Sequence, residues 1–106
     1  MTPLTEVEIE QRLAGAEHWH RGEGASPSGD DAIVRDLKLE DFGAAITVVD
    51  RVAELAEAAN HHPDILVHGW NNVRLTLSTH SAGGLTDADF ALAAEIDRVV
   101  GSSGAQ

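Results

Sequence analysis

The sequence contains no cysteine. It therefore has neither a disulfide framework nor a thiolate that could bind a metal or act as a nucleophile, and its stability must come from packing. Basic residues are also scarce, with 7 Lys and Arg against 18 Asp and Glu, for a formal net charge of −11. Because the basic residues are scattered and the chain as a whole repels phosphate, we expect no direct binding to nucleic acid.

Long hydrophobic runs are missing as well. No apolar stretch approaches the roughly 20 residues that a membrane span needs, and no basic segment followed by an apolar run opens the chain. We therefore expect a soluble cytoplasmic protein with no membrane partner. The 106 residues, of which 42% are hydrophobic, are enough for one core. The sequence predicts one domain over residues 1–100 and a flexible tail over residues 101–106.

Capping signals predict a first helix near the N-terminus. Thr5 is a candidate N-cap residue, and Glu8, three positions later, completes the pattern of a capping box. We expect the helix to run from about Glu6 to Ala14. Gly15 is a natural stop for it.

Extended segments should follow. Residues 18–20 predict a brief strand, and residues 22–29, rich in glycine, serine and proline, predict a flexible loop. Residues 32–39 place apolar side chains at alternate positions, which is the period of a half-buried strand.

The period then changes to that of a long helix over residues 41–60. Its apolar residues recur at steps of three and four and form one stripe: Phe42, Ala45, Ile46, Val49, Val52, Ala53 and Ala56. Pro63 disfavours helical geometry in the residue before it and cannot donate a backbone hydrogen bond. The helix should therefore end at His61 and His62, on a helix-to-strand corner.

A hairpin and a last helix complete the chain. Two strands, over residues 65–70 and 73–79, are predicted on either side of an Asn71-Asn72 turn, because asparagine tolerates positive φ. In the second strand the core face takes Val73, Leu75 and Leu77, and the opposite face takes Arg74, Thr76, Ser78 and His80. Thr86 and Asp89 repeat the capping pattern before a helix that should reach about Val100.

These elements together predict an α+β fold of order αββαββα. Two hairpins joined by a long helix favour a four-stranded, largely antiparallel sheet with the three helices on one face. The uncovered face, with His80 and its polar neighbours, is either solvated or packed on another subunit.

The 6 histidines invite a metal interpretation, but their spacing argues against it. Adjacent residues at a helix end do not readily converge on one ion, and no His-x-x-x-His pair lies on a helix. Acid-base chemistry suits imidazole better, since it exchanges protons near neutral pH. Glu57 lies one helical turn before His61 and is predicted to reach its ring. The alternative is an ordinary surface ion pair at a helix end, which spacing alone favours.

Three further polar or aromatic residues have structural alternatives. His80 precedes a Gly-rich turn, where side chains are often exposed, although a lone histidine there is commonly incidental. Asp89 has a capping role available, and Trp19 is either a core residue or a wall for a flat ligand, with core packing favoured. His18, His20 and His68 are interpreted as strand-surface residues.

Four motifs in this order resemble the pterin-4a-carbinolamine dehydratases. They are Glu57-x-x-x-His61-His62-Pro63, Trp70-Asn71-x-Val73, Leu77-Ser78-Thr79-His80 and Gly84-Leu85-Thr86-x-x-Asp89. The resemblance covers nearly the whole chain, from the Leu4-Thr5 helix through Ala16-x-x-Trp19 to the last helix. The loop over residues 22–29 departs from it, being longer and richer in Gly, Ser and Pro than in the animal members.

The resemblance implies a dehydratase that converts 4a-hydroxytetrahydropterin to quinonoid dihydropterin, supports tetrahydrobiopterin recycling and assembles as a homodimer or homotetramer. It implies no metal and no organic cofactor. His61 and His80 would be the acid-base pair and His62 a pterin contact, while Glu57 and Asp89 would orient the imidazoles. Trp19 matches a position near the site. Because animal relatives also serve as a dimerisation cofactor for a transcription factor, a non-catalytic pterin-binding or protein-interaction module is the alternative.

Overall fold

The computed structural model describes residues 2–22 and 24–102. In chain order, the elements are α1 (Glu6–Ala14), β1 (His20–Gly22), β2 (Ala32–Lys38), α2 (Phe42–Ala59), β3 (Asp64–His68), β4 (Asn72–Leu77), the short 3-10 helix η1 (His80–Ala82) and α3 (Asp87–Ser102). Apart from η1, this is the predicted αββαββα order, and the α+β class is confirmed.

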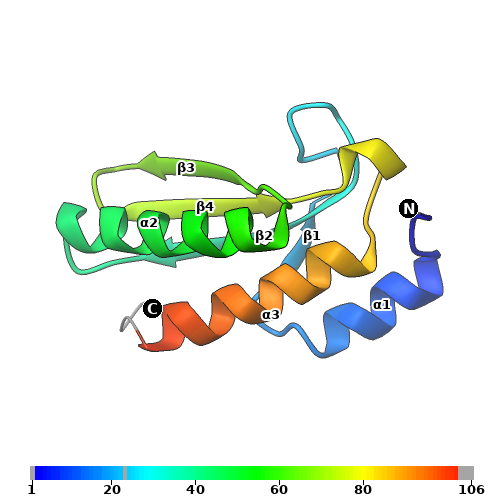
Figure 1. Cartoon of the computed structure of the whole chain (residues 1–106), viewed down its shortest axis with the longest axis horizontal. Helices are drawn as coiled ribbons and strands as arrows, with labels where there is room; N and C mark the ends of the chain where they lie inside the picture. Colours follow the sequence, from blue (N-terminus) through cyan, green and yellow to red (C-terminus); the bar gives the residue numbers. More distant parts are fainter. Residues whose placement is uncertain (1, 23, 103–106) are drawn as a thin grey trace.

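The four strands form one antiparallel sheet in the order β1-β2-β4-β3. In Figure 1, α2 is drawn across the sheet over β4 and β2, and α3 and α1 lie below it, as expected for an antiparallel sheet covered on one face. The register aligns Ile33 with Leu77 and Leu37 with Val73, so alternate positions of the central strands are buried against the helices. The prediction that Val73, Leu75 and Leu77 face the core is confirmed.

Helix α2 buries part of the predicted stripe, and Val48 in addition. Its buried residues are Ala45, Val48, Val52 and Ala56. Phe42 and Ile46, which belong to the predicted stripe, are 54% and 37% exposed. The apolar surface of α2 is therefore wider than the strip that the sheet and α3 cover.

The β3–β4 turn also differs from the prediction. His68 pairs with Asn72, so the turn consists of residues 69–71 and Asn72 already belongs to β4. The positive φ angles fall on Gly69 (54°) and Trp70 (60°) rather than on an asparagine. Asn71 instead has a buried amide that donates to the Leu39 carbonyl at 2.9 Å, which ties the turn to the segment after β2.

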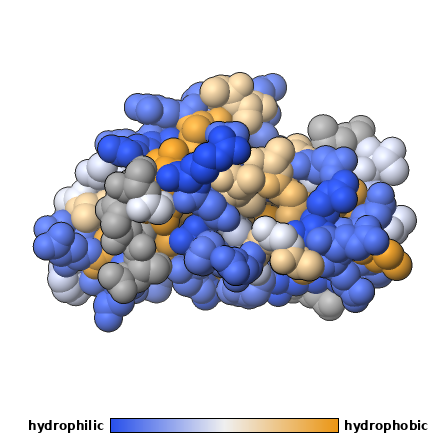
Figure 2. Space-filling view, turned by 90° about the horizontal axis from the view of Figure 1, so that it is seen from below, coloured by the Kyte–Doolittle hydropathy of each residue, from blue (hydrophilic) through white to orange (hydrophobic). Residues whose placement is uncertain are grey.

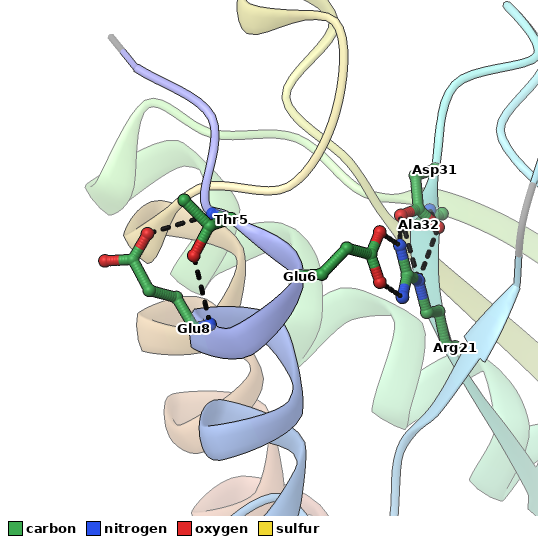
Figure 3. Close-up of polar contacts among 6 residues, drawn as sticks. All are labelled: Thr5, Glu6, Glu8, Arg21, Asp31 and Ala32. Atoms are coloured by element: carbon green, nitrogen blue, oxygen red, sulfur yellow. Dashed lines mark hydrogen bonds and ion pairs between the residues drawn. The ribbon is translucent and has the colours of Figure 1, made fainter.

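The N-terminal prediction is confirmed in detail for α1. The Glu8 backbone N–H donates to Thr5 Oγ1 at 3.3 Å, and the Thr5 backbone N–H donates to Glu8 Oε1 at 2.9 Å (Figure 3). Strand β1 begins at His20 and not at residue 18, because the segment before it turns: the Trp19 N–H donates to the Ala16 carbonyl at 2.9 Å.

Arg21 joins α1 to the sheet. Its guanidinium bonds both carboxylate oxygens of Glu6 at 2.6 Å and also the Asp31 carboxylate, with Nε at 2.9 Å from Oδ2 (Figure 3). These two carboxylates raise the pKa of Arg21, and Arg21 in turn lowers the pKa of Glu6. The pairs fix the first helix beside the start of β2.

The last helix is slightly longer than predicted. It runs to Ser102 rather than to about Val100, and residues 103–106 of the predicted tail lie outside the described residues. Seen from the helix side, the surface is largely hydrophilic, with hydrophobic side chains in separate patches (Figure 2). No helix in the described part of the chain is long and apolar enough to cross a membrane.

Candidate active site

Helix α2 ends at a left-handed residue, one step before the histidines. Asn60 has φ 50° and ψ 42°, and its backbone N–H donates to the Ala56 and Glu57 carbonyls. The His61 N–H also donates to the Ala56 carbonyl, at 3.1 Å. Asparagine tolerates this conformation and closes the last turn. The expectation that Pro63 sets the end of the helix is thus corrected: Asn60 ends it, and Pro63 lies in the link to β3.

His61 pairs with Asp89 and not, as predicted, with Glu57. The Nε2 atom of His61 lies 2.6 Å from Asp89 Oδ1. The Asp89 side chain is 0% exposed, and the His61 side chain is 16% exposed. The spacing rule within one helix failed here, because His61 lies beyond the helix end and its ring turns toward α3. A buried carboxylate thus holds an imidazole that is partly accessible.

Asp89 lies in the first turn of α3, where capping holds its carboxylate. Oδ2 accepts the backbone N–H of Thr86 at 2.9 Å and the hydroxyl of Thr79 at 2.8 Å. The predicted capping role of Asp89 is therefore confirmed. Its contact with His61 adds a second role to the first. The positive end of the α3 dipole also favours a negative charge at this position.

Glu57 contacts the other histidine of the pair. Its Oε2 atom lies 3.2 Å from His62 Nε2, and both side chains are more than half exposed. An exposed pair of this kind contributes little to stability. Glu57 therefore orients His62 loosely at the surface.

His80 lies in η1 and is 82% exposed on the side chain. Because this short helix follows β4, the alternation of the strand does not extend to His80. Its Nδ1 atom is 3.0 Å from Asp30 Oδ2, on the loop before β2. Hydrogen bonds from His80 and from Ser28 lower the pKa of Asp30.

Asp30 was not predicted from the sequence. It lies 50 residues before His80, and the loop around it has no periodicity that would indicate a contact. Within the loop, Ser28 Oγ donates to Asp30 Oδ2 at 2.7 Å, and the Asp30 N–H donates to Ser26 Oγ at 2.9 Å. The serines of this Gly- and Ser-rich segment thus position the carboxylate that reaches His80.

Contacts to Asp89 link the segments around His61 and His80. In Figure 1 the end of α2 lies near the centre of the molecule, and η1, the start of α3 and the loop before β2 lie to its right. Thr79, which contacts Asp89, directly precedes His80. Each of these histidines has its own carboxylate partner: Asp89 for His61, Glu57 for His62 and Asp30 for His80.

An apolar groove lies between α2 and α3 and borders His61. It has a volume of about 440 Å³ and is lined by Leu55, Ala58, Ala59, His61, Ala88, Ala91, Leu92 and Glu95. Small side chains on facing turns of the two helices leave this space. A molecule in the groove would have the His61 ring within reach, and the size lies in the range of small-molecule sites.

Trp19 belongs to the core. Its side chain is 5% exposed, and its Nε1–H donates to Asp97 Oδ1 at 2.9 Å. Arg35 contacts the same carboxylate oxygen from β2. The favoured interpretation of Trp19 as a core residue is therefore confirmed, and a ring this deeply buried has no open face for a flat ligand.

Over residues 2–22 and 24–102, no group of at least three His, Asp or Glu side chains converges so as to hold a metal ion. The arrangement that the site does offer is imidazole next to carboxylate, which is suited to proton transfer.

A family model and similar proteins from other organisms all point to one family. The family model for pterin 4 alpha carbinolamine dehydratase matches residues 2–99. A protein from Chloroflexus aggregans, named "putative pterin-4-alpha-carbinolamine dehydratase", is 50% identical over 101 residues, covering 95% of this chain and 100% of its own. One from Nocardia farcinica with the same name is 49% identical over 96 residues, covering 91% and 93%.

Two solved structures are also similar. A protein from Brucella melitensis, described as a transcriptional coactivator/pterin dehydratase, has a TM-score of 0.82 and 32% identity, covering 92% of this chain and 98% of its own. A pterin dehydratase-like protein described as a RuBisCO assembly factor in the alpha-carboxysome has a TM-score of 0.62 and 24% identity, covering 78% and 89%. At that identity the second likeness shows the fold alone.

Proposed function

The chain belongs to the pterin 4 alpha carbinolamine dehydratase family, and we propose that it removes water from a 4a-hydroxytetrahydropterin to give the quinonoid dihydropterin. This reaction would support tetrahydrobiopterin recycling. The observation that carries the proposal is the pair formed by His61 and the buried Asp89, with Nε2 and Oδ1 2.6 Å apart. A purely structural role requires no partly accessible imidazole held against a buried carboxylate.

The reaction requires protonation of the departing oxygen and deprotonation of a ring nitrogen. The bond from C4a to its hydroxyl oxygen breaks, and the oxygen leaves as water once an acid has protonated it. A base accepts the proton of the adjacent ring nitrogen, and the electron pair of that N–H bond forms the new double bond to C4a. Hydroxide is a poor leaving group, so the acid contributes most where it protonates the departing oxygen.

Histidine side chains can fill both roles near neutral pH. We assign acid-base roles to His61 and His80 and a pterin contact to His62. Asp89 orients His61: because Nε2 faces the carboxylate, any proton that His61 exchanges with a bound molecule must pass through Nδ1. Glu57 supports His62 at the surface. These steps involve proton transfer alone, so the proposed mechanism includes no metal and no organic cofactor.

Substitution of His61 tests the assignment. His61→Ala should lower kcat by roughly 10²–10⁴-fold, which is the usual contribution of a general acid or base. His18→Ala is the matched control, because His18 is an exposed histidine in the turn before β1. Full activity of a folded His61→Ala protein, measured as formation of the quinonoid product, would contradict the role of His61.

A protein-interaction function is the second candidate. The Brucella melitensis relative is described as both a transcriptional coactivator and a pterin dehydratase. If the chain acts only through a partner, His61→Ala should leave partner binding intact, and the wild-type protein should not accelerate dehydration. The two functions therefore separate on one variant and two assays.

Self-association remains a prediction, and we propose a homodimer or homotetramer. Exposed apolar side chains support it: Phe42 and Ile46 on α2, and Leu66 on β3, which is an edge strand. Light scattering coupled to size exclusion should report a mass of two or four times 11.2 kDa. A monomer at micromolar concentration would contradict the proposal.

A cytoplasmic location also stays a prediction.

A further inference from the structure

Thr79 contacts the buried carboxylate that orients His61, and the proposed mechanism gives it no role so far. The side chain of Thr79 lies in the interior with 6% exposure for the residue. Its backbone is fixed by two hydrogen bonds to Gly84, at 2.9 Å from its N–H and 3.3 Å to its carbonyl. The hydroxyl is thus held in place beside Asp89.

The direction of the hydrogen bonds follows from the number of hydrogens available. Thr79 Oγ1 has one hydrogen and donates it to Asp89 Oδ2 at 2.8 Å. The contact of 2.8 Å between the hydroxyls of Thr79 and Thr86 must therefore have Thr86 as the donor. Thr86 Oγ1 in turn accepts the Ala88 N–H at 3.3 Å. The chain of donors runs from the α3 backbone through two hydroxyls to the carboxylate.

Among the described residues, every hydrogen-bond partner of Asp89 Oδ2 is consequently a donor. The Thr79 hydroxyl and the Thr86 backbone N–H both point hydrogens at it. No carboxyl proton can lie on Oδ2 without losing one of these bonds. Oδ1 is therefore the oxygen left to accept from His61, and the two donors on Oδ2 fix the plane of the carboxylate so that Oδ1 stays beside Nε2.

We propose that Thr79 is a positioning residue for the dehydration, acting through Asp89 to keep the proton of His61 on Nε2 and leave Nδ1 facing the substrate. This inference rests on the proposed function for its kinetic consequence. Its structural consequence, the tautomer of His61, does not depend on activity. Thr79 does not itself touch the substrate in this arrangement.

The test compares three variants. Thr79→Val keeps the shape of the side chain and removes the hydroxyl, and Thr79→Ser keeps the hydroxyl. Thr76→Val is the matched control, because Thr76 is as deeply buried, at 7% exposure, and makes none of the contacts with Asp89 described above. Circular dichroism and thermal unfolding establish that each variant is folded.

Two readouts follow for each variant. We expect Thr79→Val to lower kcat by about tenfold with little change in KM, at the lower end of the ~10–100-fold effect seen for outer partners of metal-bound histidines. Thr79→Ser and Thr76→Val should stay near the wild-type kcat. In the free protein, ¹⁵N chemical shifts should report Nε2–H for neutral His61 in the wild type and a mixture of tautomers in Thr79→Val.

The outcomes separate the inference from the proposed function. A wild-type His61 tautomer in Thr79→Val, or a kcat equal to that of Thr76→Val, would overturn the role of Thr79. A loss of activity in Thr79→Ser as large as in Thr79→Val would also overturn it, because the hydroxyl is then not what matters. If the wild-type protein lacks dehydratase activity, the proposed function fails, and the tautomer measurement still decides the role of Thr79.

Discussion

Replacing Asp89 by asparagine should change the chemistry of His61 without changing its position. Oδ2 of Asp89 accepts two donors, from Thr79 and from the Thr86 backbone. In Asp89→Asn the amide oxygen must take the Oδ2 place, because an NH₂ group there would face both donors. The NH₂ group then occupies the Oδ1 place and donates to His61 Nε2. His61 is forced to carry its proton on Nδ1, which is the wrong nitrogen for the proposed role.

Two effects contribute to the expected loss of kcat in Asp89→Asn. A hydrogen bond to a charged group contributes roughly 1.5–3 kcal/mol, and about 1.36 kcal/mol corresponds to a tenfold change in rate. Loss of the hydrogen bond between His61 and the Asp89 carboxylate therefore predicts a fall in kcat of about 10- to 100-fold. A carboxylate-to-amide change that imposes the wrong histidine tautomer costs roughly 10⁴-fold in kcat in the serine-protease triad. We therefore expect kcat of Asp89→Asn to fall between about 10²- and 10⁴-fold.

The assay is quinonoid product formation at saturating pterin, with Asp87→Asn as the control. Asp87 lies in the same turn of α3, is largely exposed, and pairs with Arg12 at 2.5 Å. Its replacement should leave kcat within about twofold, since exposed ion pairs contribute little. A folded Asp89→Asn protein with a wild-type kcat would contradict the proposed role of Asp89. So would an unchanged His61 tautomer by ¹⁵N spectroscopy.

Three further predictions concern the other partners of the site and the acid stability of the fold. His80→Ala should lower kcat by roughly 10²–10⁴-fold with the thermal midpoint nearly unchanged, because His80 is 82% exposed on the side chain; a wild-type kcat would argue against its role. Asp30→Asn should cost less than about tenfold in kcat, because the pair it forms with His80 is open to solvent; a loss as large as that of His80→Ala would contradict this. In the folded state Arg21 lowers the pKa of Glu6, and Arg74 lowers the pKa of Asp36. Both carboxylates therefore stabilise the fold at pH values above their unfolded pKa values of 4.5 and 3.8, respectively. This stabilisation is lost as the pH falls through the lowered pKa values. The thermal midpoint should accordingly fall on acidification below about pH 4.5, and less steeply in Asp36→Asn, as followed by circular dichroism.

Much of the fold could be predicted because local signals agree with one another. The capping pattern of Thr5 and Glu8 placed α1 correctly, and strict alternation placed Val73, Leu75 and Leu77 in the core. Where prediction failed, the deciding interaction was tertiary. The exposure of Phe42 and Ile46 depends on where α3 and the sheet lie against α2, which its own periodicity does not encode.

In the candidate site, too, sequence-based prediction failed where contacts between distant segments decide the structure. Spacing along α2 suggested that Glu57 would pair with His61, but the left-handed Asn60 turns the chain, and His61 reaches Asp89 from another helix. Asp30 and Thr79 are 50 and 10 residues away from the groups they contact. No pattern in the sequence indicates these pairs, because they depend on loops and strand ends that meet only in the folded chain.

Stopped-flow ultraviolet absorbance of freshly generated 4a-hydroxytetrahydropterin, recorded with and without the purified protein, measures the proposed dehydration directly. We expect the wild-type protein to accelerate decay to the quinonoid dihydropterin, and His61→Ala to abolish most of this acceleration. Decay at the uncatalysed rate in the presence of folded wild-type protein would contradict the proposed function.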